Sequence, residues 1–445
     1  LPAQAWLDAV AEQLGPNRWW QTPTLCWWFG AEKFLHVLCA SGVVLALLAF
    51  AGVARKLSLA LLWIAYLSLC TVGQDFLNFQ WDALLLESGL LAVVLAPARW
   101  LARPRIDPPR LARWLVWLLL FRLMFLSGLV KLTSGDDAWL NFTALTYHYE
   151  TQPLPTCLAW WAHQAPLWFQ RASCIAMFVI ELPGAFLLFG PRRVRHIAVL
   201  AQILLQLLIA LTGNYTFFNL LTIVLCLMFF DDAWWARWFG VAPRAWGDVC
   251  PPRSLVNRLA YTAIFVVFLG AAAIVTLPSL FPRPRNWPPA YLAVLNGIGA
   301  TRSVNSYGLF RVMTKLRPEI VFEGSNDGRT WHEYELHWKP GDVMRRPSLV
   351  APHQPRVDWQ LWFAALAHPR REPWVLRFCE HLLRGSPTAK SLLTTDPFPD
   401  EPPRYVRALV YDYRFTTREE RARTGAWWHR DAINYYVPPI ALRSR

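Results

Sequence analysis

The sequence lacks the short motifs by which many enzymes can be identified from their residues alone. It contains no glycine-rich phosphate-binding loop and no G-x-S-x-G nucleophile turn. It has eight cysteines, most of them in or beside apolar runs, and no two are spaced as C-x-x-C. We therefore predict neither a disulfide framework nor a thioredoxin-type redox site, and we interpret the cysteines as small buried apolar side chains.

Lysine is scarce, although the chain carries a formal net charge of +14. Only six of the 44 basic residues are lysines, and the arginines are spread over loops and the C-terminal third. No basic patch interleaved with aromatic residues matches a nucleic-acid-binding module, so we expect no nucleic-acid partner. The preference for arginine is typical of a GC-rich genome and suggests a bacterial source.

Residues with the spacing of metal ligands are also missing. His332 and His337 would point to opposite faces of a strand, and His353 and Asp358 flank Pro355. Neither pair has the spacing of a zinc site. We predict no metal site and no cofactor.

Long apolar runs are what the sequence has in abundance. The hydrophobic fraction is 55% and the mean hydropathy is +0.25, both high for a soluble enzyme. The excess lies before residue 281, in runs of about 15–22 residues, the length that crosses a bilayer core. Tryptophans gather at the ends of these runs, as they do at membrane interfaces. We predict a polytopic α-helical bundle of about eight spanning helices: 34–53, 57–72, 83–97, 111–131, 172–189, 196–212, 214–230 and 259–280.

The loops between these runs alternate between arginine-rich and arginine-poor. By the positive-inside rule the arginine-rich loops are cytoplasmic, so loop 132–171 and everything after residue 281 are predicted on the other side. Three further segments, 6–14, 157–170 and 232–240, are predicted to be helices that lie along the membrane surface.

The sequence pattern changes after residue 280. A proline-rich linker, 281–300, separates the predicted transmembrane domain, 1–280, from a C-terminal domain, 301–445. In this domain apolar and polar residues alternate as in strands, and we predict a β-rich fold of sandwich type with one helical insertion. The predicted strands are 317–324, 331–338, 404–416 and 432–437, and the predicted helices are 357–366 and 373–385.

Two charged residues, Glu87 and Arg122, lie inside predicted spans. Each would cost about 2.5–3.5 kcal/mol if it faced lipid. We expect both to face the bundle interior, either as an ion pair that fixes helix packing or as part of a polar pathway. Asp82 stands at the start of span 83–97, where the helix dipole favours an anion.

The stretch from Lys131 to Pro155 is the strongest candidate for function. Lys131 ends a predicted span, and it could extend its ammonium group into the lipid headgroups or act as a partly desolvated base. His148 and Glu150 could form a general acid–base pair or bind a polar ligand. The candidate catalytic residues are therefore Lys131, His148 and Glu150, and the candidate binding residues are Tyr147, His148, Tyr149, Glu150 and Gln152.

A second candidate binding surface lies in the C-terminal domain. Aromatic, arginine, histidine and aspartate residues are mixed in segments 305–310 and 339–363, as on surfaces that recognise protein or carbohydrate. A hydrogen-bonded loop that braces the domain is the alternative interpretation. The residues assigned to this surface are Tyr307, His353, Arg356, Asp358 and Trp359.

Four blocks of the sequence resemble the lipase maturation factor family. They are FQWDALLLE at 79–87, FRLMF at 121–125 with Lys131, LTYHYETQPLP at 145–155, and YGLF at 307–310 with Trp359-Gln360. The resemblance implies a multi-pass membrane protein that helps secreted lipases to reach their active, assembled state. It implies the endoplasmic reticulum membrane in eukaryotic relatives and the inner membrane of a bacterium. It also implies a further membrane helix before Leu1.

The membrane half is more distantly similar to the helical bundle of the vitamin K-dependent carboxylase type, in which a lysine near the membrane surface serves as the base. Lys131 is the counterpart that this similarity implies, but the surrounding motif differs and the carboxylase activity is not carried over.

Two functions of different classes follow from these features. The first is a non-enzymatic maturation factor that binds a secreted lipase-like client with loop 132–171 and the C-terminal domain. The second is a membrane enzyme that acts on a lipid or a secreted substrate through Lys131 and His148. A transporter is less favoured, because matched halves with Gly/Pro-broken helices are missing.

Overall fold

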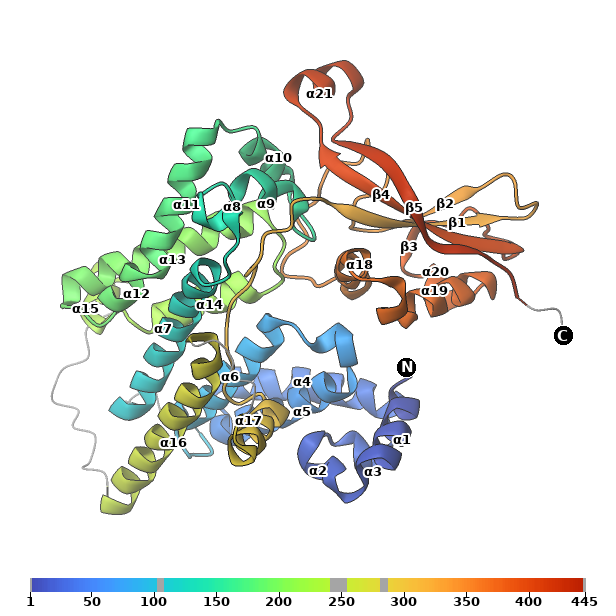
Figure 1. Cartoon of the computed structure of the whole chain (residues 1–445). Helices are drawn as coiled ribbons and strands as arrows, with labels where there is room; N and C mark the ends of the chain where they lie inside the picture. The colour runs from blue at the N-terminus through green and yellow to red at the C-terminus, as the bar shows by residue number, and fades with distance from the viewer. Residues whose placement is uncertain (1, 102–107, 241–253, 281–286, 443–445) are drawn as a thin grey trace. The chain divides into compact units, whose positions relative to one another are not determined.

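The computed structural model describes residues 2–101, 108–240, 254–280 and 287–442, without the side chains of residues 279 and 280. The chain, coloured by residue number in Figure 1, divides into two compact units, each assembled from three segments. Unit 1 comprises Leu1–Thr133, Phe178–Gln206 and Leu220–Arg311, and unit 2 comprises Ser134–Met177, Leu207–Asn219 and Val312–Arg445. The loop that follows Lys131 therefore belongs to the same unit as the C-terminal sheet.

The described residues of unit 1 form helices and the loops that connect them. Its helices are α1 (Ala3–Leu14), η1 (Gly15–Asn17), α2 (Arg18–Gln21), α3 (Cys26–Phe29), α4 (Glu32–Ala51), α5 (Arg55–Val72), η2 (Gln74–Leu77), α6 (Gln80–Leu95), α7 (Arg110–Leu132), α12 (Pro183–Leu187), α15 (Asp232–Phe239), α16 (Leu255–Leu280) and α17 (Pro289–Thr301). Three helices have residues in both units: α11 (Leu167–Glu181), α13 (Arg192–Thr212) and α14 (Phe218–Leu227).

Six helices in the described part of the chain are long and apolar enough to cross a membrane. They are Glu32–Ala51, Arg55–Val72, Arg110–Leu132, Leu167–Leu187, Arg192–Thr212 and Leu255–Pro278. A seventh candidate arises if α14 and α15, which are bent by 107° at their junction, form one broken span. All of them coincide with predicted runs, so the multi-pass character is confirmed, whereas the predicted number of eight is not.

The predicted span 83–97 corresponds to α6, which has only 16 residues. At 1.5 Å per residue it is about 24 Å long, and the hydrocarbon core is about 30 Å thick. Its buried side chains include Trp81, Leu84 and Leu91, together with the charged Asp82 and Glu87. A short helix with buried polar groups is best explained as an inner helix of unit 1.

The proline-rich linker predicted over residues 281–300 is in part a helix. Helix α17 occupies Pro289–Thr301, and Pro288 and Pro289 stand at its start. Proline is tolerated in the first turn because its missing N–H would have no partner there. The apolar residues from Tyr291 to Ile298 then continue the helix. The many prolines of this segment had led to the prediction of a linker.

Unit 2 is built from short helices and one antiparallel sheet. Its elements are α8 (Asp137–Leu140), α9 (Leu145–Thr151), α10 (Cys157–His163), β1 (Pro318–Ser325), β2 (His332–Leu336), α18 (Arg356–Leu366), η3 (Pro369–Arg371), α19 (Pro373–Leu383), α20 (Pro387–Lys390), β3 (Leu393–Thr395), β4 (Tyr405–Phe415), α21 (Arg418–Thr424) and β5 (Trp428–Ile440). The predicted helix 157–170 is therefore interrupted, because α10 ends at His163 and α11 begins at Leu167.

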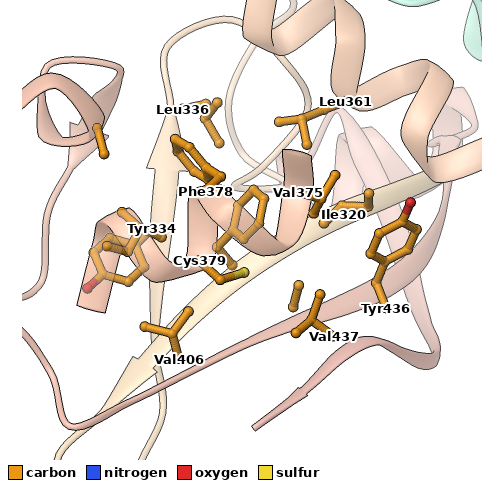
Figure 2. Close-up of a cluster of buried hydrophobic side chains, with 14 of the residues drawn as sticks. Ile320, Tyr334, Leu336, Leu361, Val375, Phe378, Cys379, Val406, Tyr436 and Val437 are labelled. Carbon is orange, nitrogen blue, oxygen red and sulfur yellow. The ribbon is translucent and has the colours of Figure 1, made fainter. Parts of the chain in front are cut away.

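The sheet has the strand order β3-β2-β1-β4-β5, and all neighbours are antiparallel. One face of the sheet is apolar, because alternate residues such as Ile320 and Phe322 point the same way. These side chains pack against Leu361 of α18 and against Phe378 and Cys379 of α19 (Figure 2). The β-rich domain is thus confirmed. Helices pack against the sheet in the described residues, and a sandwich of two sheets is not confirmed.

Candidate functional site

The polar-aromatic string of residues 145–155 forms helix α9 followed by an extended segment. The helix ends at Thr151, and Gln152 is extended, with a φ of −63° and a ψ of 153°. Pro153 explains this end, since proline disfavours the helical conformation of the residue before it. We call residues 145–155 the signature loop.

Arg317 holds the end of α9 and the extended part of the signature loop that follows it. Its guanidinium donates to the carbonyl oxygens of Glu150 at 2.5 Å and Pro153 at 2.8 Å, and also to that of Gln152. The side chain is fully buried and forms an ion pair of 2.8 Å with Glu319. Burial lowers the pKa of Arg317 and the charge of Glu319 opposes this shift, so the guanidinium remains a cation. No sequence signal distinguishes this arginine from the others.

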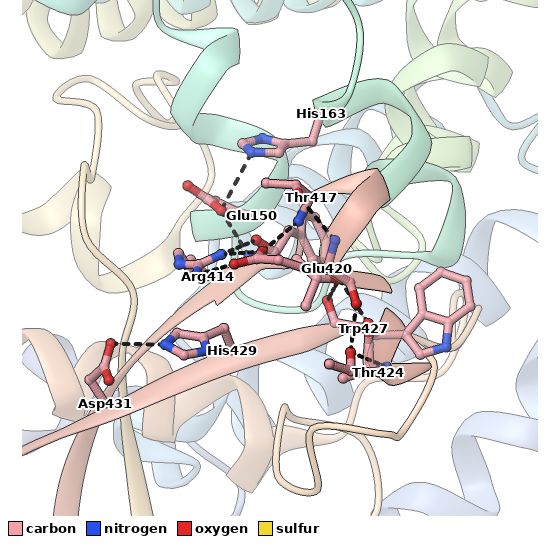
Figure 3. Close-up of polar contacts among 12 residues, drawn as sticks. Glu150, His163, Arg414, Thr417, Glu420, Thr424, Trp427, His429 and Asp431 are labelled. Carbon is pink, nitrogen blue, oxygen red and sulfur yellow. Dashed lines mark hydrogen bonds and ion pairs between the residues drawn. The ribbon is translucent and has the colours of Figure 1, made fainter. Parts of the chain in front are cut away.

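Glu150 connects the signature loop to β4 and α10, as Figure 3 shows. Its carboxylate accepts the backbone N–H of Phe415 at 3.0 Å and lies 3.5 Å from Nε2 of His163. The predicted acid–base pair of His148 and Glu150 is therefore not formed. The two residues are neighbours in sequence, but Glu150 is engaged by the sheet and by a different histidine.

His148 and Gln152 contact Tyr215, which was not among the predicted site residues. The Tyr215 hydroxyl donates to Oε1 of Gln152 at 2.7 Å and lies 3.2 Å from Nε2 of His148. Burial raises the pKa of Tyr215 well above its usual range, so the phenol keeps its proton. Gly213 is needed beside this contact, because a Cβ at this position would overlap the Gln152 side chain.

Asn214 joins the same loop to the C-terminal part of unit 2. Its side-chain N–H groups donate to the carbonyl of Leu154 at 3.1 Å and to that of Ser348 at 2.8 Å. Its side-chain oxygen accepts the N–H of Val350 at 2.6 Å and that of Ala351 at 3.0 Å. One buried amide thus fixes both segments.

Several predicted binding residues of the C-terminal domain brace unit 2. Asp358 is buried and accepts the backbone N–H groups of Trp338 at 2.9 Å and Lys339 at 2.8 Å. Burial raises the pKa of Asp358, although these two N–H groups oppose the shift. The ring of Trp359 lies 6.1 Å from that of Tyr215. These contacts favour the bracing interpretation over an open recognition surface.

The remaining predicted binding residues of unit 2 are less deeply engaged. His353 and Arg356 flank the start of α18, and the His353 ring lies 6.4 Å from that of Trp338. Tyr147 is half-buried, whereas Tyr149 packs against the aromatic cluster around Trp160.

The predicted intramembrane ion pair of Glu87 and Arg122 is present in unit 1. Nη1 of Arg122 donates to Oε1 of Glu87 at 2.7 Å, and both side chains are buried. The other carboxylate oxygen accepts the Asn305 N–H and the Tyr307 hydroxyl, both at 2.8 Å. Tyr307 is therefore a buried partner of Glu87, not part of a binding surface. Asp82 is likewise internal and accepts the Tyr66 hydroxyl at 2.6 Å.

Lys131 is buried in an ion pair. Its Nζ donates to Oε2 of Glu181 at 2.8 Å, and both side chains are at most 7% exposed. Extension into the lipid headgroups, one of the two alternatives that the sequence left open for Lys131, does not match this buried position. Lys131 belongs to unit 1 and His148 to unit 2.

His163 should make unit 2 sensitive to acid. Burial lowers the pKa of its imidazole, and the charge of Glu150 opposes this shift only in part. The unfolded chain then binds the proton more readily, so stability is lost as pH falls below the ordinary histidine value of about 6.5. We expect His163→Gln to flatten the loss of stability between about pH 7 and 5, measured by hydrogen exchange of the Phe415 amide.

The matched control for this prediction is His429→Gln. The His429 side chain is 46% exposed and lies beside Asp431 in the same unit, as Figure 3 shows. We expect its replacement to leave the pH profile of the Phe415 amide unchanged. If His163→Gln and the unsubstituted protein have the same profile, buried His163 does not cause the acid sensitivity.

Two family models match the chain, one in its N-terminal part and one in its C-terminal part. Residues 1–237 match the model of the lipase maturation factor transmembrane domain, and residues 303–438 match that of the lipase maturation factor C-terminal domain. Lipase maturation factor 2 of Gallus gallus is 37% identical over 96% of this chain and 75% of its own length. Lipase maturation factor 2 of Homo sapiens is 37% identical over 96% of this chain and 76% of its own length. Lipase maturation factor 1 of Mus musculus is 32% identical over 99% and 81%. No solved structure matches the chain.

Proposed function

Since this chain belongs to the lipase maturation factor family, we propose that it is a multi-pass membrane protein that brings secreted lipases to their active state. We further propose that the signature loop and the sheet of unit 2 together make its client-binding part, on the extracytoplasmic side. This side follows from the arginine-rich loops, which the positive-inside rule assigns to the cytoplasm.

The contacts of Arg317 are the observation that supports a client-binding part made of the signature loop and the sheet. A buried arginine that donates to three carbonyl oxygens of the loop, those of Glu150, Gln152 and Pro153, makes the loop a rigid element of the sheet domain. A preformed surface loses less conformational entropy when it binds a partner. The loop and the sheet would then act on a client as one body.

The contacts of the candidate catalytic residues favour a non-enzymatic role over the alternative membrane enzyme. Lys131 is neutralised by Glu181, Glu150 accepts a backbone N–H of β4, and His148 lies beside Tyr215. Each of these groups has a structural partner within its own unit.

The function is tested by expressing a secreted lipase in cells that lack this protein and in cells that contain it. We expect the lipase polypeptide in both, but enzymatic activity per molecule only where the full chain is present. A secreted hydrolase of unrelated fold serves as the control client. Equal specific activity of the lipase in the two cell lines would contradict the proposal.

A pair of variants distinguishes the proposed maturation factor from the alternative of a membrane enzyme. We expect Lys131→Met to reduce lipase maturation strongly, because it leaves Glu181 buried without its cation, at a cost of about 3–5 kcal/mol. The double variant Lys131→Met/Glu181→Gln removes both charges and should recover most of the maturation activity. The measurement is specific lipase activity, normalised to the amount of this protein in the membrane.

A catalytic lysine predicts the opposite result. If the double variant accumulates to the normal level but remains as inactive as Lys131→Met, then Lys131 has a chemical role and the enzyme alternative is correct.

A further inference from the structure

A group of apolar side chains in unit 2 stays exposed where α10 leads into α11. Leu158, Trp161, Leu167, Trp168 and Phe169 are 44–70% exposed and come from twelve consecutive residues. Exposed apolar side chains gathered in this way mark a contact surface. We call residues 157–169 the elbow.

The opposite side of the elbow is firmly attached to the sheet. Trp160 is buried, and its indole N–H donates to the Thr416 carbonyl at 3.0 Å. It packs in one cluster with Phe415 and Trp428 of the two neighbouring strands. Consecutive residues of α10 thus face different surroundings: Trp160 faces the sheet, and Trp161 remains exposed.

An arginine of α21 lies beside the elbow, and other arginines of α21 and α11 are exposed. The guanidinium of Arg421 in α21 lies 5.7 Å from the Trp161 ring centre and 4.7 Å from that of Trp160, which joins α21 to α10. Arg418 and Arg423 of the same helix are exposed, and so is Arg171 in α11. Positive charge beside exposed tryptophan is the combination that favours an anionic lipid surface.

The elbow is continuous with a membrane span. The span candidate Leu167–Leu187 begins within it, so Trp168 and Phe169 occupy the first turn of a helix that is long and apolar enough to cross a bilayer. An aromatic residue at such a helix end lies at the level of the lipid headgroups. Trp161 precedes Leu167 by six residues, across the short connection between α10 and α11.

We propose that the elbow and the exposed arginines of α21 form an anchor that binds the headgroup layer of an anionic phospholipid bilayer. The anchor attaches the sheet of unit 2 to the membrane surface through the Trp160 contact with β4. A client that approaches the sheet would then meet it at the surface of the bilayer. This inference goes beyond lipase maturation and does not depend on it.

Photo-crosslinking of the full chain in lipid nanodiscs tests the anchor. The reactive residue p-benzoylphenylalanine replaces Trp161, and mass spectrometry counts the phospholipid adducts. The control position is Tyr405, an aromatic residue 37% exposed at the start of β4. It is ten residues from Phe415 at the other end of the strand, or about 33 Å at about 3.3 Å per residue. Leu158, on the same side of α10 as Trp161, is a second position should the first variant not accumulate.

We expect lipid adducts at Trp161 to exceed those at Tyr405 several-fold in equal parts of phosphatidylglycerol and phosphatidylcholine. Pure phosphatidylcholine should lower the yield, by about fivefold for each arginine that contacts the surface. The double substitution Arg418→Glu/Arg423→Glu should abolish this dependence on composition while leaving Arg421 in place.

Three results would overturn the anchor. The first is a yield at Trp161 no higher than at Tyr405. The second is a yield that does not change with lipid charge. The third is crosslinking of Trp161 to a second copy of this chain or to a client, which would make the elbow a protein interface.

Discussion

Arg317→Met is expected to release the signature loop from the sheet. The substitution leaves three loop carbonyls without their donor and leaves Glu319 with only Lys339, at 3.1 Å, as a cation partner. Removing one member of a buried ion pair costs about 3–5 kcal/mol. Hydrogen exchange of the amides from Glu150 to Thr156 in the full chain should therefore accelerate by about two to three orders of magnitude.

Arg414→Met is the matched control for this substitution. Arg414 also pairs with a glutamate of unit 2, Glu420, but its side chain is 43% exposed. An exposed pair contributes about 1 kcal/mol or less, so the exchange of the loop amides should change little. If Arg317→Met leaves the loop amides as protected as this control does, then Arg317 does not hold the loop. Loss of loop protection should be accompanied by loss of lipase maturation, because the proposed client-binding part is then no longer rigid.

Arg122→Met is expected to lower the amount of folded protein strongly. Glu87 would stay buried with the Asn305 N–H and the Tyr307 hydroxyl as donors but without a cation. The cost is again about 3–5 kcal/mol, which is a large fraction of the free energy of unfolding of a typical domain. The measurement is the steady-state level in membranes and the thermal unfolding midpoint in detergent.

The compensating variant is Arg122→Met/Glu87→Gln. It removes both charges, and a glutamine still accepts from Asn305 and Tyr307, so we expect much of the lost protein to return. Arg192→Met is the surface control, because this arginine is 55% exposed in its pair with Asp231 and should cost about 1 kcal/mol or less. A double variant that is as scarce as Arg122→Met would instead favour a polar pathway that needs both charges.

Local patterns predicted much of the fold. Alternation of apolar and polar residues placed a strand at 317–324, and β1 runs from Pro318 to Ser325. The helix predicted at 357–366 is α18, Arg356–Leu366. These elements follow from periodicities of two and 3.6 residues, which are properties of neighbouring residues. The cost of a charge in lipid likewise predicted that Glu87 and Arg122 would face the bundle interior, with an ion pair as one of two alternatives.

The candidate site was predicted less well, because its contacts join distant parts of the chain. Arg317 meets carbonyls more than 160 residues earlier, and Tyr215 meets His148 and Gln152 from a loop between two membrane helices. Nothing in the local sequence distinguishes these two residues from other arginines and tyrosines. The partner of Lys131 is also distant, since Glu181 is 50 residues further on.

The sequence by itself determined the multi-pass character of this protein, its β-rich C-terminal part and its family. Hydropathy, periodicity and motifs depend only on residues that are close together in the sequence. The tertiary structure decided what the polar residues of the signature loop do. His148, Glu150 and Gln152 could have been catalytic by composition alone. Their hydrogen bonds to β4 and to Tyr215 instead attach the signature loop to the rest of unit 2. A buried polar group is stable only when it is hydrogen-bonded.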